Sequence, residues 1–216
     1  MPILWIIRHG ETAWNAEGRV QGQTDVPLSE VGFAQSQAIA RVLVPPVRSS
    51  GESGFAAIYS SDLLRARQTA DPVARKLGLP MHLDPALRER HYGMFETLTY
   101  AEVRERYPED YARFRMKDPE YDFRGGEGLR AFFERCMACL TGIAARHVGD
   151  EILIFTHGGV LEMAYRNALG LGLSSKRDFE IPNAALNRIE VTGSEWKILL
   201  WADCAHLETA LDDLPD

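Results

Sequence analysis

Apolar segments of two kinds alternate along the chain and predict alternating strands and helices. Short continuous apolar runs are typical of buried strands, whereas apolar residues spaced three and four apart are typical of amphipathic helices. The expected strands are residues 4–7, 55–59, 81–83 and 151–155, with 186–191 and 196–201 as a hairpin or adjacent strands near an edge. The expected helices are 29–42, 63–77, 99–115, 127–147 and 160–169.

Polar and breaking residues mark where these elements begin and end. Ser29 is expected to cap the first helix, which stops before Pro45-Pro46, and residues 60–62 are expected to cap the second. Pro72 predicts a kink or restart, and Pro108 a break. The Ser- and Gly-rich segment 47–54 is typical of a surface loop. Strands alternating with helices predict an α/β fold, a three-layer α/β/α sandwich around a mostly parallel sheet.

One domain, residues 1–216, is the expected organisation. A chain of 216 residues suits one domain, although its length also leaves room for two. No internal repeat or low-complexity tract interrupts it. The charged and aromatic segment 92–126 predicts a short helical lid inserted into this domain.

Composition narrows the classes of function. The formal charge of −7 disfavours a nucleic-acid partner, which needs a basic face. The apolar start, residues 1–7, is too short for a signal peptide or a membrane span, so a cytoplasmic protein without membrane association is expected. Three cysteines cannot all pair, which suits a reducing compartment. Cys136 and Cys139 have thioredoxin-like spacing, but they lie in the middle of a predicted helix, which favours structural burial.

Two histidines follow predicted strands. His9 and His157 each come directly after an apolar run and directly before glycine, so both could project into the crevice at the carboxyl ends of parallel strands, where open α/β sheets bind ligands. A lone histidine in such a loop is more often a structural residue, but two in matching contexts favour a shared site. Arg8, Arg65 and Glu89 also lie at element ends.

This set suits phosphoryl transfer. Guanidinium groups can hold phosphoryl oxygens with bidentate, charge-assisted hydrogen bonds. An imidazole can attack phosphorus and form a labile P–N bond, and a carboxylic acid can protonate the leaving alkoxide and then activate water. Glu89 is the candidate acid; on charge pattern alone it could equally be a surface carboxylate paired with Arg88 or Arg90.

The motifs around these residues resemble the signature of the histidine phosphatase superfamily, which includes cofactor-dependent phosphoglycerate mutase. The resemblance spans nearly the whole chain. It is carried by residues 8–15, Arg19, Gln21-Gly22, Asp25, Pro27-Leu28, Gly32, residues 60–70, Leu87-Arg88-Glu89, Gly93, Phe95-Glu96, residues 125–127, residues 156–159, Asn183 and His206-Leu207.

The resemblance implies a role for each of the five principal residues. His9 would be the phosphorylated nucleophile, Arg8, Arg65 and His157 would form the phosphate pocket, and Glu89 would be the proton donor. Further contacts to phosphate or substrate are expected from Asn15, Gln21, Gly22, Gln23 and Gly158. Relatives often have glycine at position 97 and serine at position 128, where this chain has Thr97 and Gly128; we expect these differences to bear on substrate contacts.

Hydrolysis is favoured over mutase chemistry. A mutase must keep water from phosphohistidine, and segment 92–126 is short for a lid that does so. We therefore expect a phosphatase acting on a small phosphorylated metabolite, without a metal or cofactor; bisphosphoglycerate priming would apply only to a mutase. The turn 126–129 is similar to that of α-ribazole phosphatases.

Two other classes and the oligomeric state stay open. In a metalloprotein His9, His157 and a carboxylate would be ligands, but neighbouring arginines would repel a cation. A non-catalytic module could use the fold to hold a phosphorylated partner. A homodimer is compatible with the sequence, and His91 is expected to be an exposed loop residue.

Overall fold

A mixed six-stranded sheet forms the centre of the computed structural model, which describes residues 1–43, 54–210 and 212. The strands are β1 (Ile3–Arg8), β2 (Ala57–Ser60), β3 (Met81–Leu83), β4 (Glu151–Thr156), β5 (Leu186–Thr192) and β6 (Glu195–Asp203), in the order β3-β2-β4-β1-β5-β6. The first four are parallel, whereas β5 runs antiparallel to β1 and to β6. The mostly parallel sheet with a hairpin at one edge is thus confirmed.

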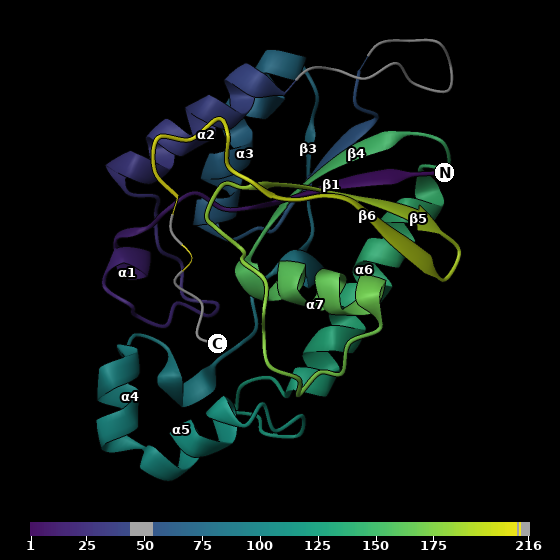
Figure 1. Ribbon diagram of the computed structural model, residues 1–216. Coiled ribbons are helices and arrows are strands. Elements are labelled where there is room, and N and C mark those ends of the chain that lie inside the picture. The colour runs from purple at the N-terminus through teal and green to yellow at the C-terminus, as the bar shows by residue number, and fades with distance from the viewer. Residues whose placement is uncertain (44–53, 211, 213–216) are drawn as a thin grey trace.

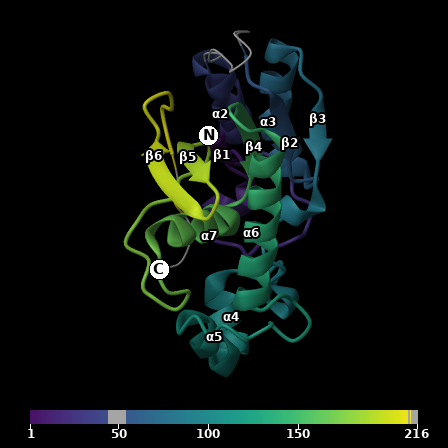
Figure 2. The same ribbon diagram turned by 90° about the vertical axis from the view of Figure 1, so that its right-hand side faces the viewer.

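Helices cover both faces of this sheet, so the predicted three-layer sandwich is also confirmed (Figure 1). The helices α2 (Glu30–Val42) and α3 (Leu64–Leu77) pack on one face, and α6 (Leu129–Arg146) and α7 (Gly158–Leu169) on the other, an arrangement that the turned view repeats (Figure 2). The predicted surface loop 47–54 lies outside the described residues, except for its last position.

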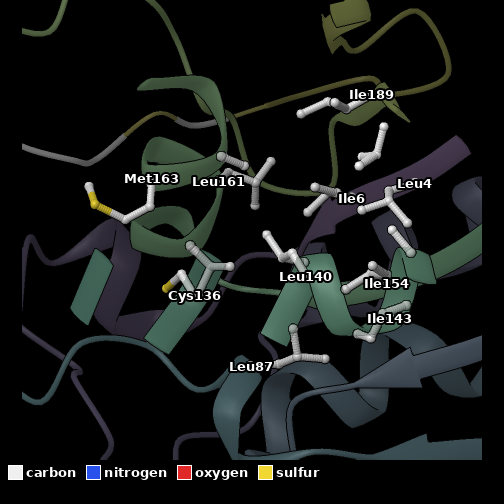
Figure 3. Close-up of a cluster of buried hydrophobic side chains, with 14 of the residues drawn as sticks. Leu4, Ile6, Leu87, Cys136, Leu140, Ile143, Ile154, Leu161, Met163 and Ile189 are labelled. Atoms are coloured by element: carbon white, nitrogen blue, oxygen red, sulfur yellow. The ribbon is translucent and has the colours of Figure 1, made fainter. Parts of the chain in front are cut away.

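The buried strands β1 and β4 feed two cores because successive side chains of a strand point to opposite faces. Leu4 and Ile6 of β1 join the core beneath α6 and α7, where Leu140 and Leu161 meet them (Figure 3). Ile7 joins the core beneath α2 and α3. Burial on both faces explains the continuous apolar runs of these strands.

Several helix ends differ from the sequence expectation. Ser29 caps α2 as predicted, by accepting a hydrogen bond from Gly32 N. The predicted cap at residues 60–62 is wrong: in the described chain α3 begins after Leu63, and its first N–H, that of Leu64, donates to Asp25 Oδ1 at 2.6 Å. The predicted restart at Pro72 is wrong, because α3 continues through this residue; the helix ends at Leu77, and its C-cap is Gly78, whose φ of 64° suits glycine.

Three short elements lie outside the strand and helix ranges expected from the sequence. They are α1 (Ala13–Ala16), closed by a Thr12–Asn15 capping box, and the 3₁₀ turns η1 (Pro85–Leu87) and η2 (Gly93–Phe95).

The predicted lid is a pair of short helices, α4 (Tyr100–Arg106) and α5 (Pro108–Arg115), divided at Pro108 as expected. They lie apart from the two helical layers, on the side of the sheet where β1 ends (Figure 1). A small aromatic core of their own holds them, formed by Val20, Phe95, Val103, Tyr121 and Phe123. Nowhere in the described part of the chain is a helix both long and apolar enough to cross a membrane.

Candidate active site

The parallel pairing of β1 and β4 brings the two strand-end histidines together. Arg8 is in register with Thr156, so the residues that follow, His9 and His157, leave the sheet side by side. His9 N donates to Thr156 O at 2.9 Å, and the ring centroids of the two imidazoles lie 5.3 Å apart. Both side chains are buried. The ends of these two parallel strands therefore bring two buried imidazoles together, as inferred from the sequence.

The tautomer of His9 follows from its hydrogen bond. Nδ1 lies 2.7 Å from the carbonyl oxygen of Gly10, which can only accept, so Nδ1 carries the proton and Nε2 holds the lone pair. Burial lowers the pKa of His9 well below its usual value, and the positive charges of Arg65 and Arg8 lower it further. The ring is consequently neutral and nucleophilic at Nε2.

Two buried guanidinium groups supply positive charge beside His9. Arg65 donates through Nη1 to Thr24 O at 2.9 Å and through Nη2 to Gly22 O at 2.7 Å, while its Nε has no partner among the described residues. Burial lowers the pKa of Arg65 to about 10, so it remains charged near neutral pH. Arg8 donates to Ile181 O at 2.6 Å and lies 4.0 Å from the carboxylate of Asp212.

Glu89 faces the same pocket with both carboxyl oxygens held. Oε1 accepts from Arg90 N at 2.7 Å, and Oε2 accepts from Gly159 N at 3.0 Å. Burial raises the pKa of Glu89, although the two backbone hydrogen bonds and the positive charges of Arg65 and Arg8 act against this. A buried carboxyl with a raised pKa is suited to carry a proton. The alternative of a surface carboxylate paired with Arg88 or Arg90 is wrong.

His157 is held by a residue that the sequence did not single out by itself. Its Nε2 lies 2.8 Å from Ser61 Oγ, and its buried Nδ1 has no partner in the described chain. Burial, followed by the charge of Arg65, lowers the pKa of His157 well below its usual value. A second neutral ring with an unused nitrogen therefore lies beside His9.

Most of the predicted site residues line one pocket. Its walls are Arg8, His9, Asn15, Arg19, Val20, Gln21, Gly22, Arg65, Glu89, Tyr92 and Tyr100. Three predicted contact residues are not among these walls: His157 is fully buried beside His9, Gln23 donates through Nε2 to Glu89 O at 3.2 Å, and Gly158 opens α7. His91 is confirmed as a loop residue, with 44% of its side chain exposed.

The sequence reasoning missed part of the pocket wall. Arg19 entered only through the resemblance, and Val20, Tyr92 and Tyr100 were not singled out. The position of Tyr92, three residues after Glu89, was the available signal that it lies in the pocket. Tyr100 reaches the pocket through the packing of the lid helices.

Glu96 connects two walls of the pocket. Its carboxylate accepts from Gln23 N at 3.1 Å and Tyr92 N at 3.0 Å, and from the hydroxyl of Thr24 at 3.0 Å. The loop that it holds, residues 22–24, provides the carbonyls that orient Arg65. Glu96 thus fixes the distance between the guanidinium group and the segment that carries Glu89.

The loop after His9 is pressed against α2 at two glycines. A Cβ on Gly32 would lie 2.0 Å from Glu11 O, and a Cβ on Gly10 would lie 2.7 Å from Gly32 O, both backbone atoms. No side chain fits at either contact, so these glycines allow the loop to approach the helix closely.

In residues 1–43, 54–210 and 212, no group of three or more His, Cys, Asp or Glu side chains is arranged to hold a metal ion. The cationic side chains among the pocket walls are the buried Arg8 and Arg65 and the partly exposed Arg19. Together with the sheet, they define an α/β protein with an arginine-lined pocket at the carboxyl ends of parallel strands, an arrangement suited to an anionic ligand.

Comparison with known proteins identifies the family. Residues 4–204 match the histidine phosphatase superfamily (branch 1), and the chain belongs to this superfamily. The resemblance in the sequence motifs is thereby confirmed.

Three relatives are similar over most of their length. Phosphoglycerate mutase-like protein 4 of Arabidopsis thaliana is 38% identical over 94% of this chain and 86% of its own length. The metal-independent phosphoserine phosphatase of the same plant is 36% identical over 94% of this chain and 82% of its own. The structure of Bacillus stearothermophilus YhfR has a TM-score of 0.85 and 31% identity, covering 96% of this chain and all (100%) of that one. These relatives support a phosphatase or mutase activity.

Proposed function

We propose that this chain is a phosphatase that hydrolyses small phosphate monoesters by way of a phosphohistidine at His9. The main support is the state of His9: a buried, neutral imidazole with its lone pair on Nε2, next to two buried guanidinium groups. An incoming phosphoryl group would find the nucleophile and its compensating charges already in position.

The proposed reaction has two displacements. In the first, Nε2 of His9 attacks phosphorus, the P–O bond to the alcohol breaks, and the alcohol oxygen takes the proton of Glu89. The hydrogen bond from Nδ1 to Gly10 O then stabilises the positive charge on the phosphorylated ring. In the second, Glu89 takes a proton from water, the resulting hydroxide attacks phosphorus, and the P–N bond breaks to release inorganic phosphate.

The other pocket residues would act on the phosphoryl oxygens. Arg8 and Arg65 are proposed to bind them, and the N–H of neutral His157 is proposed to donate to the charge that develops in the transition state. Asn15, Gln21 and Gly22 are proposed to complete the phosphate pocket. We propose that no metal ion is required, because the arginines take the role that Mg²⁺ has in other phosphoryl-transfer enzymes. The name of the metal-independent phosphoserine phosphatase relative agrees with this.

A chromogenic assay tests the proposal. The purified chain should hydrolyse p-nitrophenyl phosphate in the presence of EDTA, and rapid quenching should trap an acid-labile, base-stable phosphate on the protein. His9→Ala should abolish both signals, whereas the control His82→Ala, which changes an exposed residue of β3, should retain them. Normal turnover by His9→Ala would rule out the nucleophile assignment.

Mutase activity is the second candidate, supported by the name of the relative phosphoglycerate mutase-like protein 4. Assays on phosphoglycerate primed with bisphosphoglycerate should be run in parallel with hydrolysis. A mutase rate exceeding hydrolysis by orders of magnitude would replace the phosphatase proposal.

A further inference from the structure

A second cavity, of about 50 Å³, adjoins the backbone that holds the Glu89 carboxyl and is named the cavity behind Glu89. Tyr92 lines both this cavity and the phosphate pocket. The two residues whose backbone N–H groups hold the Glu89 carboxyl, Arg90 and Gly159, also line it. If Glu89 protonates the leaving alcohol, as the proposed function requires, the alcohol part of the substrate is released at the edge of this cavity.

The charges around this cavity favour an anion. Arg90, Arg115 and Lys117 line it together with one carboxylate, Glu162. That carboxylate is already engaged by the fully buried Arg166, which donates to Glu162 Oε1 through Nε at 2.9 Å and Nη2 at 2.8 Å. The cationic side chains of the wall therefore outnumber the anionic ones.

The volume suits a small polar fragment. About 50 Å³ is several times the roughly 10–15 Å³ that one water needs, so a group of a few heavy atoms fits. Phe114, Phe132 and Met163 supply apolar surface around it.

Lys117 occupies a backbone position that favours glycine. It follows α5 with φ of 50°, in the left-handed region, and the backbone bonds there, Lys117 N to Phe114 O and Asp118 N to Arg113 O, are those of a helix C-terminus. A non-glycine residue pays a conformational cost in this region. Its side chain is only 15% exposed and reaches Glu162 Oε1 at 3.0 Å. The lysine side chain gains nothing from this backbone conformation, so we attribute the residue's presence to the position of its ammonium group at the cavity wall.

We propose that this cavity receives the alcohol part of the substrate and that Lys117, with the exposed Arg115 beside it, binds a carboxylate there. The substrate class is then a phosphate monoester of a small hydroxy acid, with the phosphate at His9 and the carboxylate at Lys117. This inference rests on the proposed function for the position of the phosphate.

The test compares two ligands that differ by a single carboxylate. Binding of phosphoserine and of phosphoethanolamine is measured by calorimetry in the His9→Ala background, where neither ligand is turned over. Phosphoserine should bind more tightly. Adding Lys117→Gly should weaken phosphoserine about tenfold, the value of one modest charge-assisted hydrogen bond, and phosphoethanolamine by less than about twofold.

Two features keep this test interpretable. Lys117→Gly relieves the backbone strain, so its melting temperature should be no lower than that of the parent. Because Arg166 still neutralises Glu162, the variant leaves no orphaned carboxylate. The control Lys197→Met removes one exposed positive charge on β6 and should change neither affinity, which separates local binding from general electrostatics.

Equal loss of affinity for both ligands in Lys117→Gly, or equal affinity of the parent for both ligands, would overturn the carboxylate assignment. Failure of the proposed function would appear in a different measurement, as an absence of p-nitrophenyl phosphate hydrolysis by the wild-type chain.

Discussion

Replacing Glu89 by glutamine removes the proposed proton donor. The substitution also disturbs a site in which both carboxyl oxygens accept hydrogen bonds. Each carboxyl oxygen of Glu89 accepts one backbone N–H, from Arg90 at 2.7 Å and from Gly159 at 3.0 Å. A glutamine side chain has one oxygen and one NH₂ group. Whichever way it turns, its NH₂ group faces a backbone N–H, so one buried donor loses its acceptor.

Two effects of Glu89→Gln can therefore be estimated, one on stability and one on kcat/KM. Loss of one buried hydrogen bond should lower the free energy of unfolding by about 1–3 kcal/mol. Loss of the general acid should lower kcat/KM by about 10²- to 10⁴-fold on esters whose alkoxide cannot leave without a proton. On p-nitrophenyl phosphate, whose leaving group needs no proton, the first displacement should be much less affected.

Stopped-flow kinetics and urea denaturation measure these effects separately. With p-nitrophenyl phosphate, Glu89→Gln should release a burst of nitrophenol and then turn over slowly, because hydrolysis of phosphohistidine still needs the base. With an alkyl ester such as phosphoserine, no burst should form. The control Glu120→Gln, which alters a 69% exposed carboxylate, should shift the free energy of unfolding by less than about 0.5 kcal/mol.

Equal losses on the aryl and alkyl esters would refute Glu89 as the proton donor. An unchanged free energy of unfolding would refute the hydrogen-bond reasoning.

Two further predictions concern pH and packing. The pKa of His9 is lowered from 6.5, so its reactive neutral form persists at acidic pH. The pKa of Glu89 is raised from 4.5, so its protonated form is lost only as pH rises through that higher value. The rate should thus be greatest on the acid side of neutrality when scanned from about pH 4 to about pH 9, and a maximum on the alkaline side would contradict these directions. Gly32→Ala should cost about 1–3 kcal/mol of stability, since its Cβ would lie 2.0 Å from Glu11 O, and should weaken phosphate binding. Gly142→Ala, whose Cβ would lie 3.8 Å from the Arg146 guanidinium, should instead stabilise α6 by roughly 0.5–1 kcal/mol in thermal unfolding; equal losses in both variants would count against the contact.

The sequence was most informative where local pattern and sheet geometry act together. Apolar runs located β1 and β4, and the rule that parallel strands end at the same edge was enough to bring His9 and His157 together. The helical spacing likewise predicted the end of α3 at Leu77, and Pro108 predicted the break before α5. These features depend on neighbours in sequence or on a general property of sheets.

Contacts between residues far apart in the sequence could not be predicted in this way. The first N–H of α3 is satisfied by Asp25, 39 positions away from Leu64, rather than by residues 60–62. Similarly, Tyr100 reaches the pocket only because the lid folds back onto it.

The two departures from the superfamily pattern have structural explanations that the sequence did not provide. Thr97 has φ of 74°, in the region that favours glycine. Gly128 is the N-cap of α6, where a serine could supply a side-chain acceptor. Neither residue lines the pocket that contains His9 or the cavity behind Glu89, so the expectation that these positions bear on substrate contacts gains no support from their places in the fold.

The contrast between features set by local sequence and features set by distant contacts also applies to the two parts of proposed substrate recognition. The groups proposed to bind the phosphate stand at the ends of β1 and β4 and near the start of α3, where the sheet fixes them and where motif and position coincide. The groups proposed to bind the alcohol come from the lid and from α7, and their significance depends on backbone conformation. Lys117 is an ordinary lysine in the sequence, and only its left-handed φ and its contact with Glu162 distinguish it. A proposal for the chemistry at phosphorus could therefore be made before the fold was known, whereas a proposal for the kind of alcohol required the geometry of the segment that carries Lys117.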